Sequence, residues 1–327
     1  MPADIFDERL AKPMLIGAEG EAFDSPDFDF EVKMDGERCL AYLDAGSTLL
    51  INRRERDVTA QFPELSSLHE QAAGRCIIDG ELIVGAGGKT DFEHIKQRSA
   101  VRNPFAVERL SRERPATFVA VDILYAGREQ TTARPLTERR EVLATTLREG
   151  GGLALSRVIA ERGVEFFRAV TTRGLEGIIA KRRDSLYRMG KRTKDWIKIK
   201  HWLEADFVVC GYVAHANAAV ASLVLGQVDA SGGLVYKGRV AIGLKRDEFR
   251  LVKALPRRKG HPFSAAPPTG AGEAAWVRPE LVCRVGFMCW TDGGGLRQPF
   301  FKELRREVRP ETVVEYVPDA LRTKCAF

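Results

Sequence analysis

The sequence predicts an α+β core followed by a smaller, strand-rich barrel or sandwich. Roughly the first 200 of the 327 residues alternate strand-like and helix-like segments. After about Glu204 the chain changes to short strands separated by turns rich in Gly and Asp. A chain of this length has room for two domains at about 150 residues each. We therefore expect one domain over residues 1–203 and a second over residues 204–327.

Strands in the core are predicted from the alternation of apolar and charged residues. Phe28, Phe30 and Val32 alternate with charged residues, which is the period of two of a half-buried strand. Similar runs predict further strands, at residues 75–84, 118–125, 177–181 and 196–201.

Two amphipathic patterns in the core predict helices. One begins at Thr137 as its N-cap and places Leu136, Leu143 and Leu147 along one side. The other runs over residues 164–172, with apolar residues spaced by three.

The second domain is predicted to consist of short strands at residues 206–213, 221–229, 233–243 and 281–291, interrupted by a helical patch over 246–255. Within it, residues 207–228 carry no formal charge and are long enough to span a bilayer. The glycines and polar residues of this stretch instead favour two strands, 207–213 and 221–228, around a turn.

The composition excludes several classes of protein. Apolar residues make up 44% and charged residues 29%, which excludes intrinsic disorder and collagen-like chains. The net charge of +6 permits a polyanionic partner without requiring one. Six scattered cysteines and five histidines form no zinc pattern, so the cysteines are expected to be small core residues in a reducing compartment. No signal-peptide pattern opens the chain, and we expect a cytoplasmic protein.

A glycine-rich run at residues 85–90 has two interpretations. A phosphate-binding loop would require Gly five residues before Gly88, where the chain has Ile83, and a clear helix after the run. A hairpin turn explains the run better.

The strongest chemical signal is the sequence EVKMDGER at residues 31–38. Alternation puts Glu31 and Lys33 on one face of the strand, Gly36 allows a tight turn, and Arg38 returns beside them. A lysine on the polar face of a strand is usually only solvated. The pattern K-x-D-G-x-R, however, resembles motif I of the covalent nucleotidyltransferases, which include ATP-dependent DNA ligases, RNA ligases and mRNA-capping enzymes. In that superfamily the motif I lysine becomes linked to a nucleoside monophosphate.

Further segments resemble the other motifs of that superfamily in the expected order. The resemblance implies that Arg53 touches the nucleotide, that Glu81 lies near the ribose and that Glu176 serves the metal. It also implies that Val121 lies at the adenine site and that Arg192 contacts nucleotide and DNA. The segments that carry the resemblance are residues 52–65, 78–82, 118–124, 135–140, 176–181 and 191–200.

The chemistry of attack on ATP explains these residue types. Lys198 and Lys200, two apart on a strand, point to the same side and can both face the α-phosphate, where charge builds in the transition state. Lys33 must be neutral to attack, and neighbouring cations such as Arg38, Lys198, Lys200 and a divalent metal would lower its pKa. Glu176, together with Asp35, offers hard oxygen ligands for Mg²⁺ or Mn²⁺. The alternative for Lys198 and Lys200 is an exposed basic strand.

The second half resembles the OB-fold of bacterial ATP-dependent DNA ligases of the end-joining class, both the ligase module of ligase D and the stand-alone ligase C type. This resemblance implies that Arg297, Lys302 and Arg305 contact DNA phosphates, and that the OB-fold first orients pyrophosphate and then grips the nicked duplex. The segments concerned are residues 205–212, 234–240, 276–281 and 296–305.

Three positions depart from the family pattern. Val121 stands where relatives usually have an aromatic residue that stacks on adenine. The end of motif VI, usually R-E-D-K, reads R-R-E-V and ends at Val308, which puts its part in self-adenylation in doubt. Gln298 replaces a common His.

The resemblance implies a nucleotidyltransferase core with ATP-grasp-like antiparallel sheets and helices, followed by an all-β OB-fold barrel. It implies an ATP-dependent DNA ligase that seals nicked or broken duplex DNA through a lysyl–AMP on Lys33. Labelled ATP would reveal this intermediate as a covalent adduct. The protein would act as a monomer at the bacterial nucleoid, with a Ku-type end-binding protein as a partner. Two alternatives stay open, namely an RNA ligase or capping-type enzyme and a non-catalytic nucleic-acid-binding protein of the same fold.

Overall fold

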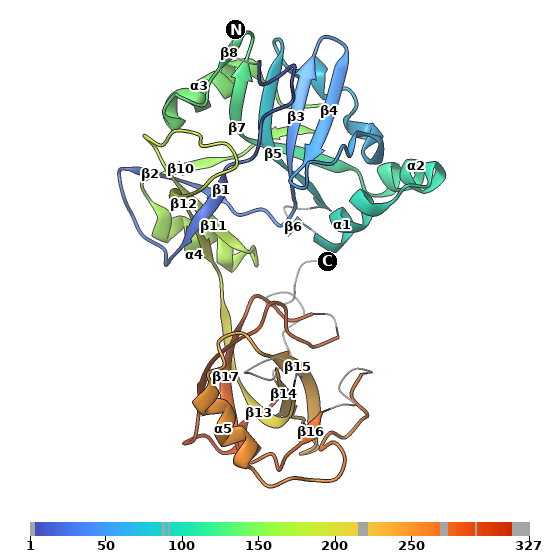
Figure 1. Ribbon diagram of the computed structural model, residues 1–327, viewed down its shortest axis with the longest axis vertical. Helices are drawn as coiled ribbons and strands as arrows, with labels where there is room; N and C mark the ends of the chain where they lie inside the picture. Colours follow the sequence, from blue (N-terminus) through green and yellow to red (C-terminus); the bar gives the residue numbers. More distant parts are fainter. Residues whose placement is uncertain are drawn as a thin grey trace. The chain divides into compact units, whose positions relative to one another are not determined.

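The computed structural model describes residues 4–86, 89–90, 92–214, 222–268, 274–291 and 293–315. The chain divides into two compact units between Lys200 and His201. Each unit has its own sheets and its own core (Figure 1). The predicted α+β core and the strand-rich second part are therefore both confirmed.

The first unit contains a five-stranded sheet in the order β1-β12-β11-β2-β10. Only the contact between β1 and β12 is parallel. Helix α4 (Gly163–Thr172) packs on one face, because Phe30, Ile178 and Ile199 form an apolar cluster with Val170 of the helix. The strands are β1 (Leu15–Glu19), β2 (Phe28–Val32), β10 (Val158–Ala160), β11 (Gly177–Arg182) and β12 (Arg192–Lys200).

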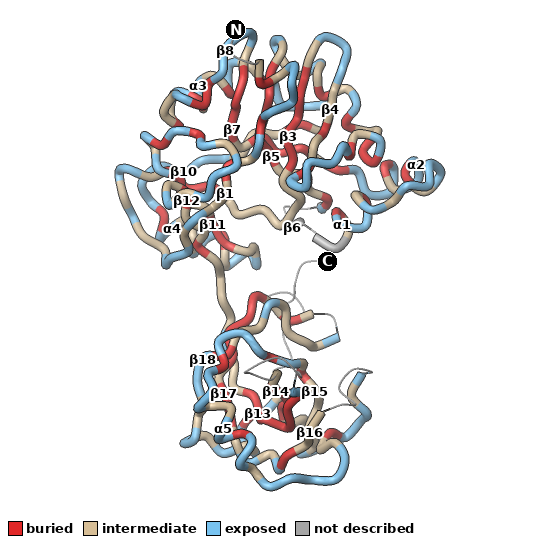
Figure 2. The backbone as a smooth tube through the Cα atoms, viewed as in Figure 1, coloured by how far each residue is buried: buried red, intermediate tan, exposed pale blue. Residues whose placement is uncertain are grey.

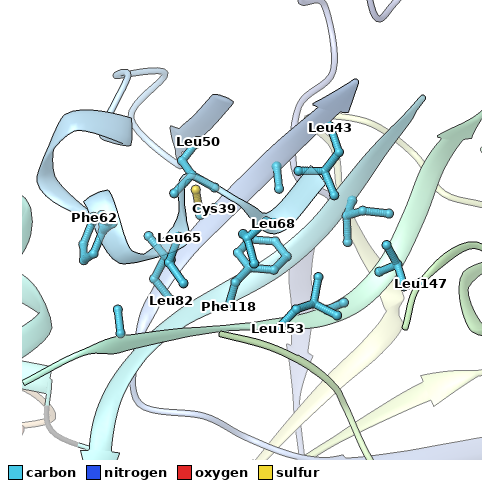
Figure 3. Close-up of a cluster of buried hydrophobic side chains, with 14 of the residues drawn as sticks. Cys39, Leu43, Leu50, Phe62, Leu65, Leu68, Leu82, Phe118, Leu147 and Leu153 are labelled. Carbon is cyan, nitrogen blue, oxygen red and sulfur yellow. The ribbon is translucent and has the colours of Figure 1, made fainter. Parts of the chain in front are cut away.

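The second sheet of this unit has seven strands, with the path β4-β3-β5-β7-β8 and with β6 and β9 paired to β5 and β7. Strand β3 is buried on both faces. Its residues Cys39, Ala41 and Leu43 enter the main core shown in Figure 3, whereas Leu40 and Tyr42 pack toward Trp196 of the five-stranded sheet. The strands are β3 (Glu37–Asp44), β4 (Ser47–Asn52), β5 (Cys76–Ala86), β6 (Lys89–Thr90), β7 (Ala116–Ala126), β8 (Glu129–Gln130) and β9 (Leu153–Leu155).

The helix predicted to start at Thr137 begins earlier than expected. Helix α3 spans Leu136–Thr146 and its N-cap is Pro135, so the predicted N-cap role of Thr137 is wrong. Proline is suited to this end because its fixed φ needs no adjustment and its missing N–H costs no hydrogen bond there. The predicted apolar side is confirmed, since Leu136, Leu143 and Leu147 are all buried.

The glycine-rich run forms a hairpin, as predicted, because Gly85 pairs with Thr90 and Ala86 with Lys89. Its central residues, Gly87 and Gly88, lie outside the described part of the chain. A helix does follow the run, contrary to expectation. Helices α1 (Phe92–Ala100) and α2 (Pro104–Glu113) come next, and three short 3₁₀ helices precede β5, at η1 (Thr59–Gln61), η2 (Pro63–Leu65) and η3 (Leu68–Gln71).

The second unit is built on a six-stranded sheet with the path β15-β14-β13-β17-β18 and β16 paired to β13. The path curls on itself, since the Phe301 N–H of β18 donates to the Ile242 carbonyl just after β15, at 2.7 Å. Helix α5 (Arg246–Ala254) lies over the apolar interior, in which Val252 is fully buried. The strands are β13 (Leu203–Val213), β14 (Ser222–Val228), β15 (Leu234–Val240), β16 (Ala275–Trp276), β17 (Val282–Phe287) and β18 (Phe300–Leu304), and a 3₁₀ turn, η4 (Pro310–Thr312), follows.

The uncharged stretch over residues 207–228 forms strands, as predicted. It contributes to β13 and β14, which pair antiparallel, and the predicted turn around Asn217 lies outside the described residues. Among the described residues no helix is long and apolar enough to cross a membrane.

A buried ion pair joins three segments of the first unit. The Arg139 guanidinium on α3 donates two hydrogen bonds to the Asp122 carboxylate on β7, each at 2.8 Å. It also donates to the carbonyls of Arg134 and Ser185, each at 2.7 Å. Both side chains of the pair are fully shielded from solvent.

We predict that Arg139→Met lowers the free energy of unfolding by about 3–5 kcal/mol, because it leaves the Asp122 charge buried without a partner. Urea unfolding followed by circular dichroism measures the loss. Arg109→Met is the matched control, since Arg109 pairs with Glu113 on an exposed helix face and should change stability little. Equal effects of the two substitutions would contradict the account.

Candidate active site

Glu31 and Lys198 of the five-stranded sheet lie on the face opposite α4. Because Phe30 and Ile199 pack toward the helix, alternation places Glu31 and Lys198 on the other face. The register brings these two residues into one row, since both pair with Ile179 of β11. The predicted separation of Glu31 from Phe30 and Val32 is thus present in the structure.

Lys33 follows directly after β2, and both its backbone and its side-chain amine are held by neighbouring groups. Its backbone N–H donates to the Gly177 carbonyl at 2.9 Å, and its Nζ lies 2.6 Å from Oε2 of Glu176. The Lys33 side chain is 19% exposed and that of Glu176 is 7% exposed. The amine is therefore fixed at a place that a ligand can reach. The nearest charged group to the Lys33 amine is the carboxylate of Glu176. The sequence predicted cations beside this amine.

Lys198 and Lys200 lie on the same face of β12. Lys198 Nζ is 2.8 Å from a carboxylate oxygen of Glu19, which lies opposite it on β1. Partial burial lowers the pKa of Lys200; the charges of Lys198 and Lys33 lower it further, while Glu176 and Glu19 oppose the shift. Lys33, Lys198 and Lys200 thus form one group of neighbouring cations.

Arg38 is held by a buried acid. Its guanidinium donates two hydrogen bonds to Asp79 on the neighbouring strand β5, and Asp79 is fully buried. The hydroxyl of Tyr187 also donates to Asp79, and it accepts a hydrogen bond from the Met14 backbone at 2.8 Å. The Arg38 guanidinium lies 5.4 Å from the centre of the Trp196 ring. These contacts fix the guanidinium in one orientation.

Glu81 pairs with Arg38 across β3 and β5. Burial raises the pKa of Glu81 to about 7, and the charges of Asp79 and Glu176 contribute, while Arg38 and Lys33 act in the opposite direction. Such a carboxyl changes its charge near neutral pH, which is frequent in binding and catalytic sites.

Glu31 is engaged inside the protein. One carboxylate oxygen accepts from Lys181 at 2.8 Å and from Arg140, and the other accepts from Ser156 at 2.7 Å. Although burial alone would raise it, the charges of Lys181 and Arg140 hold the pKa of Glu31 below its usual value. Glu31 is therefore an ionised acceptor held in a fixed position, with 3% of its side chain exposed.

Val121 lies at an irregularity of β7. Asp79 pairs with Asp122 and Gly80 with Ala120, so Val121 is the extra residue of a β-bulge. Its carbonyl accepts a hydrogen bond from Lys181 Nζ at 3.1 Å. Bulges of this kind re-aim side chains beside active sites.

The two metal candidates differ in their surroundings. Oε2 of Glu176 is buried and, apart from the close ion-pair contact with Lys33, receives no hydrogen bond within the described structure. An oxygen of this kind fits a hard cation. Asp35 is half-buried in the turn after Lys33. Within the described ranges, no three side chains of His, Cys, Asp or Glu gather into a complete metal site.

Of the two remaining predicted arginines, Arg53 lies beside Arg38, whereas Arg192 lies at the opposite end of β12 from Lys200 and is not brought beside the lysine group. The Arg53 backbone donates to the carbonyl of Arg38 at 2.9 Å, and its side chain is exposed. Arg192 opens β12 opposite Leu15, and its guanidinium donates to the Ile16 carbonyl.

The DNA-binding residues predicted in the second unit are partly neutralised. Lys302 pairs with Glu204, and Arg305 pairs with Glu307 and lies 3.7 Å from Asp206. The Arg297 backbone donates to the Cys289 carbonyl at 3.0 Å.

Sequence reasoning missed the residues that hold the site residues in place. Asp79 and Lys181 lie inside segments that match motifs, but neither received a role. Arg140, in the motif-like segment 135–140, and Tyr187 lie 109 and 108 residues from their partners Glu31 and Asp79, and no local pattern reveals these pairings.

Comparison with known families covers most of the chain. The family described as "ATP dependent DNA ligase domain" matches residues 10–200. The family described as "ATP dependent DNA ligase C terminal region" matches residues 216–308. Both matches fall in the order expected from the motifs.

Two curated relatives illustrate the similarity. The chain is 34% identical to DNA ligase C2 of Mycolicibacterium smegmatis over 302 residues, covering 89% of this chain and 80% of the relative. It is 33% identical to the multifunctional non-homologous end joining DNA repair protein LigD of Mycobacterium tuberculosis over 294 residues, covering 87% of this chain. That match spans only 37% of LigD.

Solved structures support the fold. A mycobacterial DNA ligase D complexed with ATP and MES matches with a TM-score of 0.53 and 31% identity, over 94% of this chain and 99% of the other. A Lig E DNA ligase matches with a TM-score of 0.62 at 17% identity, over 90% and 99% of the two chains, and shows the fold alone. The nucleotidyltransferase core and the OB-type second part are therefore confirmed.

We predict that Glu81→Gln stabilises the protein more at pH 8 than at pH 5. The folded-state pKa of Glu81, about 7, lies above its ordinary 4.5, so the native protein loses stability as pH rises through this window, and a neutral Gln removes that loss. Thermal unfolding at the two pH values measures the effect. Glu138→Gln on the exposed face of α3 is the control. A stabilisation independent of pH would refute the assignment.

Proposed function

The chain belongs to the ATP-dependent DNA ligases, and we propose that it joins 5′-phosphate and 3′-hydroxyl ends of nicked or broken duplex DNA through a lysyl–AMP on Lys33. The observation that carries the proposal is the place of Lys33, whose amine is partly exposed 2.6 Å from Glu176, beside Lys198 and Lys200. This arrangement falls within the matched residues 10–200.

Lys33 is the nucleophile in the first step. Its Nζ attacks the α-phosphorus of ATP, an N–P bond forms, and pyrophosphate leaves. Lys198 and Lys200 face the same side of β12 and stabilise the charge that builds on the phosphate oxygens. Glu176 keeps Nζ in position through the close contact. AMP then passes to the 5′-phosphate of the DNA, and the 3′-hydroxyl displaces it.

The residues around Lys33 bind and orient the nucleotide. Arg38, held by Asp79, and Glu81 lie on adjacent strands and are assigned to the ribose side. Glu31, a fixed and ionised acceptor, and the bulged Val121 are assigned to the base, and Arg53 to the edge of the nucleotide site. Arg192, at the far end of β12, is assigned to DNA. Val121 offers only a small apolar surface where an aromatic ring would stack.

A divalent cation, Mg²⁺ or Mn²⁺, fits beside Glu176. The buried Oε2 of Glu176 is a hard oxygen that contacts the Lys33 amine and receives no other hydrogen bond within the described residues, and Asp35 is the second candidate. When bound, the metal neutralises phosphate charge. Mg²⁺ commonly takes one or two carboxylates, with water and substrate phosphates as its other ligands.

The biological setting is proposed from the relatives. LigD is named for non-homologous end joining, which supports a role in repair at the bacterial nucleoid, with a Ku-type end-binding protein as partner. A monomeric form follows from the same resemblance. Arg297, Lys302 and Arg305 of the second unit are assigned to DNA phosphates.

We predict that incubation with α-³²P-ATP labels the protein and that Lys33→Ala abolishes labelling, because no other amine occupies the nucleophile position. Denaturing gel electrophoresis measures the covalent adduct. Lys12→Ala is the control, since Lys12 is exposed and pairs with Glu55. Labelling of the Lys33→Ala protein would contradict the mechanism.

A second prediction concerns the substrate. The protein seals a nicked DNA duplex in the presence of ATP and Mn²⁺ and seals the matching RNA nick at least tenfold more slowly. A denaturing gel of end-labelled strands gives both rates. Faster sealing of RNA, or a GMP adduct in place of AMP, points to an RNA ligase or a capping-type enzyme. DNA binding without sealing points to a non-catalytic protein.

A further inference from the structure

The second unit contains a short segment that holds most of the net charge of the chain. Residues 245–259, here called the α5 basic segment, comprise helix α5 with the residue before it and the loop after it. The segment has seven Lys and Arg and two acidic residues, so it carries a formal charge of +5, whereas the whole chain carries +6. A concentration of this kind marks a surface for a polyanion.

Both acidic residues of the segment are already engaged within it. Glu248 accepts a hydrogen bond from the Lys245 backbone at 2.9 Å, which caps the start of α5. Asp247 pairs with Arg250 at 3.0 Å. Neither carboxylate is therefore available to neutralise the loop that follows the helix.

Among the residues that the structure describes, the loop cations have no acidic partner. Arg257, Arg258 and Lys259 are exposed, and none forms an ion pair with any residue that the structure describes. Lys302 and Arg305, by contrast, are paired with acids in the same unit. The cations that the motifs point to are thus partly neutralised, whereas the three loop cations of the α5 basic segment form no ion pair with a described acid.

The loop is held by the barrel on which it lies. Arg257 forms a backbone bridge with Val277, and the Arg258 N–H donates to the Trp276 carbonyl at 3.2 Å. The Arg257 guanidinium lies 5.0 Å from the centre of the Tyr212 ring. A backbone fixed in this way loses less conformational freedom when the cations bind a ligand.

Helix α5 is held in a similar manner. Phe249 packs edge to face with Tyr212, with 5.2 Å between the ring centres, and Val252 is fully buried. Its apolar side therefore faces the barrel, and Figure 2 shows much of the helix and the loop after it as exposed.

We infer that the α5 basic segment binds the phosphate backbone of duplex DNA, as a contact surface separate from the residues that the family motifs mark. The inference rests on the proposed function, which supplies duplex DNA as the polyanion. Phosphate contacts of this kind carry no sequence information, which suits an enzyme that acts on breaks in any sequence. Each phosphate contact releases counterions, so the affinity falls as salt rises.

The test replaces the three loop cations together, as Arg257→Gln, Arg258→Gln and Lys259→Gln in one protein. Fluorescence anisotropy measures the dissociation constant of this variant for a nicked duplex at several salt concentrations. The strand whose 3′ end borders the nick terminates in a dideoxy residue, so no sealing occurs. We expect a loss of affinity of about tenfold or more at low salt, and a slope of log K against log salt that is smaller by about 2–3, at ~0.9 per lost contact.

A matched triple variant controls for net charge. It combines Arg109→Gln, Arg112→Gln and Arg309→Gln, which remove the same charge from exposed arginines that already lie beside glutamates. It should keep most of the affinity and slope. Thermal unfolding shows whether both variants fold like the parent protein.

Unchanged affinity and slope in the loop variant would overturn the inference, and so would an equal loss in the control variant. Failure of the proposed function has a different signature. A parent protein that binds the nicked duplex but forms no adduct with ATP refutes the ligase chemistry and leaves the binding measurement valid.

Discussion

The alternation of side chains along β2, β11 and β12 is the constraint on which the candidate active site depends. Phe30, Ile178 and Ile199 pack against α4, because burial against the helix removes these apolar side chains from water. The residues between them are thereby forced to the opposite face, which carries Glu31 and Lys198. A shift of one residue in the pairing would bury the lysine and expose the apolar side chains. The position of Lys33, directly after β2, is thus fixed by this packing together with its backbone hydrogen bond to the Gly177 carbonyl.

Charged side chains can be buried close to the Glu31 face of the sheet because three of them have partners of opposite charge. Arg38 is paired with Asp79, Glu31 with Lys181, and Arg139 with Asp122. A buried charge without a partner is costly, so the pairs hold one another in defined places. The partly exposed amine of Lys33 differs from these pairs in being open to a ligand on one side.

Features set by local sequence could be predicted, and features set by distant contacts could not. Alternation predicted the strand that holds Glu31, and the motif spacing predicted the group formed by Lys33, Glu176 and Lys198. The N-cap at Thr137 was wrong because Pro135 starts the helix by its fixed φ. Arg140 and Tyr187, which contact Glu31 and Asp79, lie more than one hundred residues away from them, and no local pattern reveals these pairings. The chemical roles of all the site residues, those of Arg53, Glu81 and Asp35 included, stay predictions.

The central claim is that Lys33 carries AMP during the reaction, and the intact mass of the protein tests it most directly. After incubation with ATP and Mg²⁺, the account predicts a mass increase of one AMP per chain, located by peptide mapping on Lys33. Added pyrophosphate should remove the increase, because the step is the reverse of the attack on ATP. No mass increase, or an adduct on a different residue, would contradict the account.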